Sequence, residues 1–206
     1  CFGTAGRGRA RTRRVRAEDF VLAWKRIADA HVPSRLPWSY LAGRIEGLDA
    51  FRARTARVPG SDLSRYDGNV AGLRAPDANT LVLRLTKPFP ALLSILAMHY
   101  FAPIPREAVD AYIAPAMRGE HAALPGRSPT FTRPESLVGT GPYVLAEYRP
   151  EERIVFRRNP AFRDERYPAE GDEADRSAGL LRDGGARLPR IDRIVLTRYR
   201  DRAELL

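Results

Sequence analysis

The alternation of apolar and polar residues is clearest over residues 139–160, which read GTGPYVLAEYRPEERIVFRRNP. Apolar side chains alternate with other residues on both sides of the polar segment 149–152, which contains a proline. Such alternation is typical of half-buried strands, and the polar segment has the chemistry of a turn. We therefore predict a β-hairpin in which Ile154 and Phe156 face the core while Arg157 lies outside.

A helical period governs residues 17–30, with the sequence AEDFVLAWKRIADA. The apolar residues that share one helical face are Phe20, Trp24, Ile27 and Ala28. Acidic residues occupy the first turn, where the helix dipole favours negative charge. The pattern predicts an amphipathic helix with Lys25, Arg26 and Asp29 on its outer side.

Shorter elements are expected elsewhere. They are two helical pieces in 37–54 broken near Gly43, a loop in 55–69, a short strand after residue 70 and a second one at 80–85, a buried helix at 91–98, an extended proline segment that opens a short helix in 101–113, a loop-like stretch at 114–136, a polar excursion with one helical turn at 164–189, and a closing strand at 190–199. This order of helices and hairpins favours a mixed α+β or α/β fold over a simple βαβ series.

The net charge of +10 would suit a nucleic-acid-binding protein, but its distribution does not. Residues 1–16 contain six arginines and no acidic residue, so the remaining residues 17–206 carry only +4. Basic and acidic residues are interspersed in that remainder, as on an ordinary solvated surface. We predict that residues 1–14 form a disordered basic tip. A basic nucleic-acid-associated protein stays open as the alternative if this tip is genuine.

The sequence contains no recognisable catalytic or metal-binding pattern. Its three histidines, His31, His99 and His121, are widely spaced, and Cys1 is the single cysteine. Neither a zinc motif, a nucleophile elbow nor a phosphate-binding loop is present. We therefore expect no enzyme activity, no metal and no cofactor. The chemistry that remains is recognition by aromatic and apolar side chains.

Several blocks of sequence together resemble a known family. The blocks are VRAEDFVLAWKRI, DANTLVLRLTKPFPALLSILA, APIPREAV, GTGPYVLAEYRPEERIVFRRNPAFRD and LPRIDRIVLTRY. Their order and spacing over about 15–199 resemble the family 5 extracellular solute-binding proteins, which are the oligopeptide-, dipeptide- and nickel-binding proteins of ABC importers. The Gly-Thr-Gly-Pro-Tyr block and the Arg-Asn-Pro that follows it are the specific part of this resemblance.

The resemblance implies a periplasmic-binding-protein-like fold of type II, of which this chain would hold a part: a segment of the lobe I sheet and the small extra domain, without the second lobe. Residues 15–136 would form the extra-domain portion and the start of the return to lobe I. Residues 137–206 would form the lobe I sheet segment, with an insertion at 164–189 that is longer than the family's usual link.

The resemblance also implies a function. The protein would capture peptides or related solutes in the periplasm, or another extracytoplasmic space, and deliver them to the permease subunits of an importer. Its export signal would lie outside this chain, and nucleic acid would not be a partner. Trp38 and Tyr40, in LPWSYL, align with a family stretch that contributes an aromatic residue to the ligand cleft, and His99, in MHYFAPIP, aligns with a family histidine. These three are the candidate ligand-binding residues. The alternative is core packing for the two aromatic ones, and a packed or hydrogen-bonded structural role for His99.

Overall fold

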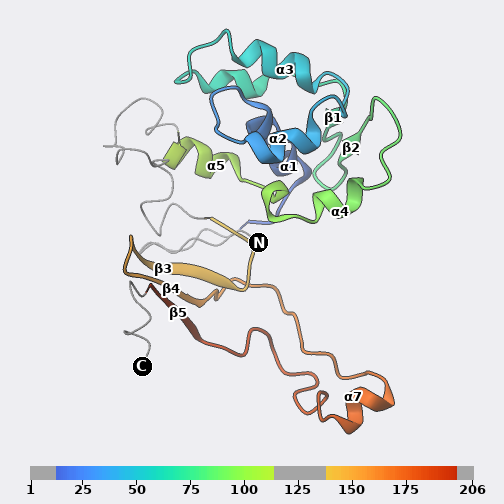
Figure 1. Cartoon of the computed structure of the whole chain (residues 1–206), viewed down its shortest axis with the longest axis vertical. Helices are drawn as coiled ribbons and strands as arrows, with labels where there is room; N and C mark the ends of the chain where they lie inside the picture. The colour runs from blue at the N-terminus through green and yellow to red at the C-terminus, as the bar shows by residue number, and fades with distance from the viewer. Residues whose placement is uncertain (1–12, 114–137, 199–206) are drawn as a thin grey trace. The chain divides into compact units, whose positions relative to one another are not determined.

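The computed structural model describes residues 13–113 and 138–198, which form two compact units (Figure 1). The first unit contains residues 15–113 and consists of short helices with a small two-stranded sheet. The second contains residues 138–198 and is built on a three-stranded sheet. Helices and antiparallel strands are thus both present, as the mixed fold class predicts. The loop expected at 114–136 lies outside the described residues, as does most of the tip at 1–14.

Helix α1 spans Ala17–Ala28 and confirms the helix predicted from the apolar period. Its apolar face is buried, with Trp24 only 2% exposed. The prediction for the outer face is wrong at two positions, because Lys25 and Asp29 are also buried. The Lys25 ammonium donates a 2.8 Å hydrogen bond to the backbone oxygen of Tyr66, and Asp29 accepts hydrogen bonds from several groups. Hydrogen bonds with residues distant in the sequence therefore allow these polar side chains to be buried.

Two short helices follow, as predicted: α2 (Arg35–Leu41) and α3 (Leu48–Thr55). Gly43 and Gly47, which separate them, have φ angles of 67° and 78°. This left-handed conformation is accessible to glycine without the steric penalty that other residues suffer. The glycines thus end the helical path after α2 and allow the chain to begin again at α3.

The segment predicted as a loop contains the 3-10 helix η1 (Leu63–Asp67), which buries Arg65 and Tyr66. Beyond it, β1 (Leu73–Arg74) and β2 (Val82–Leu83) form an antiparallel pair that is shorter than predicted. Gly72 lies where this pair meets the loop before α3. Its N–H donates to the oxygen of Glu46, and its oxygen accepts from the N–H of Arg84.

The helix expected to be buried at 91–98 is a short surface helix, so this prediction is wrong. Helix α4 spans Leu92–Leu96, and none of its residues is fully buried. Ile95 packs against the core, whereas Leu93 is 79% exposed. Only one side of this short surface helix packs against the core. Because the segment is apolar all round, its sequence does not show which side is exposed. After α4 come η2 (His99–Phe101), α5 (Arg106–Ala108) and the π-helix η3 (Val109–Ile113).

Aromatic rings lie at the centre of the first unit. The ring of Trp24 meets Phe20 and Phe101 edge-on, at centroid distances of 6.4 and 6.2 Å. The indole N–H of Trp24 also donates a 3.1 Å hydrogen bond to the backbone oxygen of Phe101. Leu41 and Phe51 belong to the same buried cluster, so α1, α2, α3 and η2 share one core.

The sheet of the second unit confirms the predicted hairpin and the predicted closing strand. Its strands are β3 (Tyr143–Arg149), β4 (Arg153–Arg158) and β5 (Arg193–Thr197), which pair antiparallel in the order β3-β4-β5. A β-bulge interrupts the β3–β4 register between Leu145 and Glu147. The strands therefore lie where the alternating pattern predicted them. The pattern did not predict the bulge.

Burial on the hairpin differs from the prediction. Arg157 is exposed, as expected, but Ile154 and Phe156 are only half-buried. The most buried residue of β4 is Val155, at 1% exposure. Val155 lies on the central strand, paired with Glu147 of β3 on one side and with a β5 residue on the other. Strand position therefore decides burial here more than side-chain size does.

An arm formed by residues 164–189 connects β4 to β5 (Figure 1). Its two sides are joined by hydrogen bonds from Tyr167 N–H to the oxygen of Ala186 and from Leu188 N–H to the oxygen of Glu165. The single predicted helical turn is present as α7 (Glu173–Ser177), whose N-terminus is capped by Asp172. Most of the arm is exposed, in line with its polar composition.

Candidate functional site

The two predicted aromatic residues lie on α2, in the first unit. Trp38 and Tyr40 are both half-buried, and both pack against the hydrophobic core. The core-packing alternative therefore accounts for part of each side chain. Each residue also keeps part of its surface exposed.

Arg52 covers the ring of Trp38. Its guanidinium carbon lies 4.9 Å from the ring centroid, within the range of a cation–π interaction. The same guanidinium donates hydrogen bonds to the backbone oxygens of Ala28 and Asp29, at 3.2 and 3.3 Å. These bonds hold Arg52 against the end of α1. The orientation of Trp38 is therefore fixed by a residue that is itself anchored to the neighbouring helix.

His99, the third predicted residue, begins η2 and is exposed. Its ring lies 3.9 Å from that of Tyr100, with the two planes inclined by 40°. Tyr100 is 38% exposed, whereas the next residue, Phe101, is buried. Sequence reasoning missed Tyr100, although the run His-Tyr-Phe was a signal that at least one aromatic side chain would remain outside the core.

The three predicted residues thus belong to one unit but to two elements, α2 and η2, which both pack on α1. Among the described contacts, Trp38 interacts with Arg52 and the core, and His99 interacts with Tyr100. No hydrogen bond or ring contact within the described residues joins His99 to either α2 residue. The elements that carry the three residues both pack on α1, but the described contacts do not bring the three side chains together in one closed pocket.

A buried polar cluster fixes the end of α1 behind this surface. The Asp29 carboxylate accepts hydrogen bonds from Arg65 Nε at 2.7 Å, from the Tyr66 hydroxyl and from the N–H of His31 at 3.0 Å. Arg65 also donates to the backbone oxygens of Gly60 and Asp62. The cluster therefore joins α1 to η1 and holds the Asp29 backbone oxygen that Arg52 uses.

The charges of the cluster follow from these contacts. Burial opposes ionisation of Asp29, but the hydrogen bonds from Tyr66, His31 and Arg65 outweigh it and lower the pKa of this carboxyl below 3.8. Burial and the hydrogen bond to Asp29 raise the pKa of Tyr66 to about 12. Burial lowers the pKa of the Lys25 ammonium. At neutral pH the cluster is therefore an ionised Asp29 with a neutral Tyr66.

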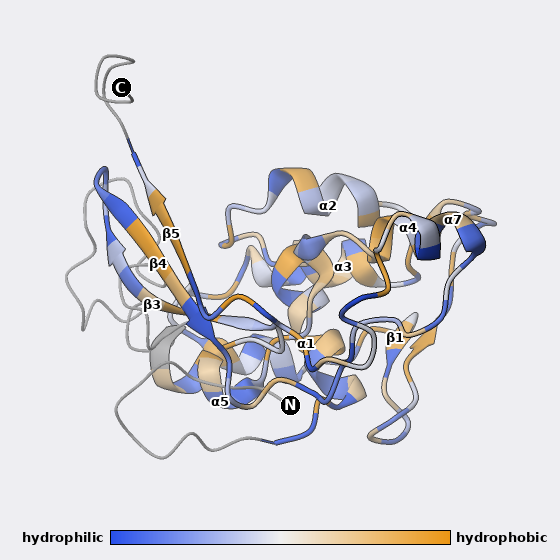
Figure 2. Ribbon diagram, turned by 90° about the horizontal axis from the view of Figure 1, so that it is seen from below, coloured by the Kyte–Doolittle hydropathy of each residue, from blue (hydrophilic) through white to orange (hydrophobic). Residues whose placement is uncertain are grey.

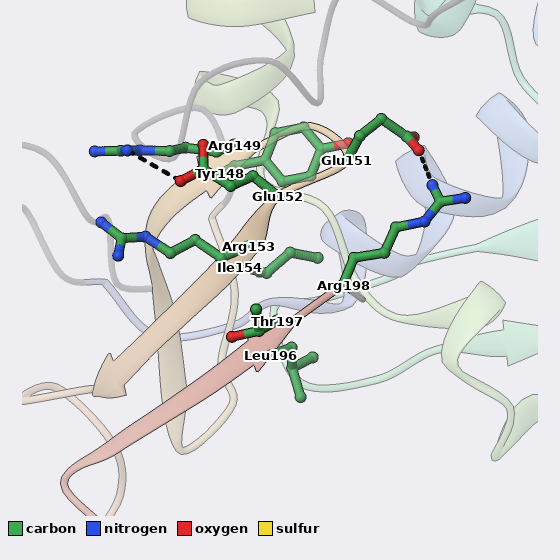
Figure 3. A pocket seen from close by; sticks show the side chains of 9 residues that line it. All are labelled: Tyr148, Arg149, Glu151, Glu152, Arg153, Ile154, Leu196, Thr197 and Arg198. Carbon is green, nitrogen blue, oxygen red and sulfur yellow. Dashed lines mark hydrogen bonds and ion pairs between the residues drawn. The ribbon is translucent and has the colours of Figure 1, made fainter. Parts of the chain in front are cut away.

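The second unit has an open hollow of about 400 Å³ at the tip of its hairpin (Figure 3). Tyr148, Ile154 and Leu196 supply its apolar side chains. The charged residues of its rim pair with one another, as in the ion pairs Arg149–Glu152 and Arg198–Glu151. Because the rim arginines have acidic partners, the hollow is better suited to apolar packing than to an anionic ligand.

Two observations limit the chemistry of the described residues. They contain no group of three or more His, Cys, Asp or Glu side chains that could hold a metal ion. None of the helices they form is long and apolar enough to cross a membrane.

Comparison with known sequences gives a consistent result. Residues 12–205 match the family model described as bacterial extracellular solute-binding proteins, family 5 Middle. The chain is 30% identical over 151 residues to the periplasmic oligopeptide-binding protein OppA of Salmonella typhimurium, covering 73% of this chain and 23% of that protein. It is 32% identical to the peptide transport periplasmic protein SapA of the same organism, covering 73% and 22%. The chain thus spans less than a quarter of the length of these relatives.

Solved structures agree with the sequence relatives. The Escherichia coli murein tripeptide binding protein MppA is 30% identical, with a TM-score of 0.51 over 71% of this chain and 24% of that one. A periplasmic oligopeptide-binding protein of Borrelia burgdorferi is similar in fold, with a TM-score of 0.60 over 92% of this chain and 29% of that one, at 18% identity. These structures confirm the predicted fold class, of which the chain represents a part.

Proposed function

Because the chain belongs to the bacterial extracellular solute-binding proteins of family 5, we propose that it forms part of a binding component that captures peptides or related solutes for an ABC importer. The observation that carries this proposal is the family match over residues 12–205. The component would work in the periplasm or another extracytoplasmic space and would pass its ligand to permease subunits. It would act by binding alone, without catalysis.

The named relatives support a peptide as the first ligand class to test. OppA, SapA and MppA are all described as peptide-binding or peptide-transport proteins. One relative of 27% identity, YgiS of Escherichia coli, is described as a probable deoxycholate-binding protein. The family relationship therefore favours peptides and leaves room for an apolar solute. The alternative of a nucleic-acid-associated protein finds no support in the names of these relatives.

Trp38, Tyr40 and His99 are the residues that we propose to contact the ligand. Each retains exposed ring surface, and Arg52 holds Trp38 in place. Aromatic rings suit a site that accepts varied side chains, because they provide apolar contact area with few rotatable bonds. The ligand's polar backbone would need further partners. The chain spans less than a quarter of the length of OppA and SapA, so we expect most of these partners on segments that it does not span, and weak binding by the 206-residue chain alone.

The test is isothermal calorimetry with a pool of tripeptides and, separately, with deoxycholate. It uses the 206-residue chain and a longer product that includes the flanking coding sequence. We expect the longer product to bind the peptides and the shorter one to bind far less, because affinity requires a ligand enclosed on both sides. Trp38→Ala should weaken peptide binding by the longer product. Leu36→Ala, on an exposed residue of the same helix, should not.

Two outcomes would contradict the proposal in different ways. If neither peptides nor deoxycholate bind the longer product, the proposed ligand class is wrong. If peptides bind but Trp38→Ala, Tyr40→Ala and His99→Ala all leave the affinity unchanged, the function stands and the proposed contact residues are wrong. Micromolar binding by the 206-residue chain alone would place the main recognition site within it.

A further inference from the structure

Arg52 carries a positive charge that has no acidic partner among the described residues. Its hydrogen bonds are donated by one nitrogen, Nη1, to the backbone oxygens of Ala28 and Asp29. The carboxylate of Asp29 bonds instead to Arg65 and Tyr66. A guanidinium has further N–H donors on Nε and Nη2. Those of Arg52 are open to solvent, since the buried polar atoms that lack a hydrogen bond in the described part of the chain belong to other residues.

Trp38, whose ring lies under Arg52, adds a second donor without an acceptor. Its indole N–H makes no hydrogen bond within residues 13–113 and 138–198, and it is not one of their buried unpartnered atoms. The other tryptophan of the chain differs, because the N–H of Trp24 donates to the oxygen of Phe101. The Arg52–Trp38 pair therefore presents to solvent two kinds of N–H donor and part of an apolar ring.

The Arg52–Trp38 pair lies where three helices meet. Arg52 is on α3, Trp38 is on α2, and the oxygens that hold Arg52 are at the end of α1. Helix α1 contacts both of the others, and Figure 2 shows the three helices close together, with hydrophilic and hydrophobic residues on each. The bonds to α1 hold the guanidinium beside the ring before any ligand arrives. A ligand that uses both groups would therefore lose little free energy in ordering them.

We propose that Arg52 is a specificity-determining residue that binds a carboxylate of the ligand, while an apolar group of the same ligand lies on Trp38. This inference rests on the proposed function. An ionised carboxylate supplies the acceptors that both residues lack, and its hydrogen bonds to a guanidinium are about twice as strong as those between neutral groups. A cationic ligand would instead meet an unneutralised positive charge and be rejected. Peptides offer two suitable groups, the C-terminal carboxylate and an acidic side chain.

Arg54, on the same helix, provides a matched control. Its guanidinium carbon lies 5.5 Å from the ring centroid of Phe51, so it is also an arginine over an aromatic ring. Phe51 is fully buried, however, and Arg54 donates to the backbone oxygen of Asn69. A ligand cannot reach that ring, so a change at Arg54 removes a comparable charge without affecting the proposed contact.

The test is calorimetry of the longer product that includes the flanking coding sequence. Its ligands are the tripeptides Ala-Glu-Ala and Ala-Gln-Ala, each as the free acid and as the C-terminal amide. Loss of the carboxylate that Arg52 binds should weaken binding about tenfold, as expected for a hydrogen bond to a charged group. The side-chain change and the amide show which of the two carboxylates is bound. Arg52→Gln should remove this difference, whereas Arg52→Lys, which keeps the charge, and Arg54→Gln should retain it.

Quenching of tryptophan fluorescence tests the charge without any ligand. The 206-residue chain has two tryptophans, and Trp24 is only 2% exposed, so an ionic quencher reports on Trp38. At equal ionic strength, the anion iodide should quench Trp38 more strongly than the cation caesium. Arg52→Gln should remove this preference and Arg54→Gln should not. Trp38→Phe should abolish the quenching and so confirm its source.

The outcomes separate this inference from the proposed function. If the longer product binds none of the four peptides, the proposed function fails and the inference fails with it. If it binds them, but neither carboxylate matters or Arg52→Gln leaves the difference in place, the inference is wrong and the function stands. An equal loss for all four peptides in Arg52→Gln would mean that Arg52 only positions Trp38. Equal quenching by iodide and caesium in the unchanged chain would also overturn the inference.

Discussion

The phenol of Tyr66 donates a hydrogen bond to the carboxylate of Asp29, although the two residues are 37 positions apart in the chain. Both are buried, at 4% and 0% exposure. Arg65 supplies a second donor to the same carboxylate. Because an ionised carboxylate inside a protein depends on such donors, this contact makes the end of α1 and the helix η1 depend on each other.

Asp29→Ala should therefore be strongly destabilising. It leaves Arg65 and Tyr66 buried without their acceptor, and breaking a buried ion pair typically costs about 3–5 kcal/mol. Glu46→Ala, which removes an exposed pair with Arg84 in the same unit, should cost less than about 1 kcal/mol. Urea denaturation of both variants gives the comparison. Similar small losses for the two would show that the Asp29 cluster contributes little to stability.

The raised pKa of Tyr66 predicts a loss of stability at alkaline pH. The pKa is about 12 in the folded chain and 10.0 for an ordinary tyrosine, so the neutral phenol stabilises the fold below pH 10. That contribution is lost as pH rises from 10 towards 12. Lys25, whose pKa is lowered by burial, acts in the opposite direction and is present in both proteins compared. The difference in unfolding free energy between the unchanged chain and Tyr66→Phe should shrink over this range; a constant difference would contradict the shift.

Gly72→Ala should destabilise the first unit. A Cβ atom at this position would lie 2.6 Å from the backbone oxygen of Arg84 and 2.6 Å from the backbone nitrogen of Glu46. Backbone atoms in a paired segment cannot move away easily, so we expect a loss of about 2 kcal/mol or more.

Gly68→Ala is the matched control for this substitution. The nearest atom to its new Cβ is the end of the Arg54 side chain, at 3.1 Å, which can rotate away. Thermal melting of the two variants compares them directly. Equal melting temperatures would mean that the turn at Gly72 adapts to a side chain.

The burial of three neighbouring residues in the hairpin predicts the order of the stability losses that their substitution causes. Val155 is almost fully buried on the central strand, so Val155→Ala should cost about 2 kcal/mol. Phe156 is half-buried, so Phe156→Ala should lose less than the 3–5 kcal/mol or so typical of a fully buried aromatic residue. Arg157→Ala, at an exposed position, should stay below about 1 kcal/mol. Urea denaturation of the three variants checks the order of their stability losses. A loss for Arg157→Ala as large as that for Val155→Ala would contradict it.

What the sequence predicted well were elements whose cause is local. The alternation around the turn at 149–152 led to β3 and β4, and the helical period of Trp24 and Ile27 led to α1. The wrong predictions concern residues whose burial depends on contacts with distant parts of the chain. Lys25 and Asp29 are polar residues that the period places outside, and only the distant Arg65 and Tyr66 explain why they are buried.

The candidate site depended on a different kind of information. Trp38, Tyr40 and His99 came from the resemblance to a family, because no local pattern distinguishes a ligand-binding aromatic residue from a core one. The structure leaves each partly or fully exposed, and their contact with a ligand stays a prediction. The limits proposed for the extra domain and the lobe I segment likewise stay predictions. Tyr100 shows what the resemblance missed, since its exposure follows from how η2 packs.

Helix α1 also has a consequence for the order in which the protein matures during synthesis. Its first N–H, on Ala17, donates to the oxygen of Ala78, and the oxygen of Asp19 accepts from the N–H of Ile104. The indole of Trp24 bonds to Phe101. A nascent chain leaving the ribosome therefore exposes the apolar side of α1 long before its partners exist. Until residue 104 has emerged, this helix lacks part of the partners that cover it, and exposed apolar surface of that kind favours aggregation.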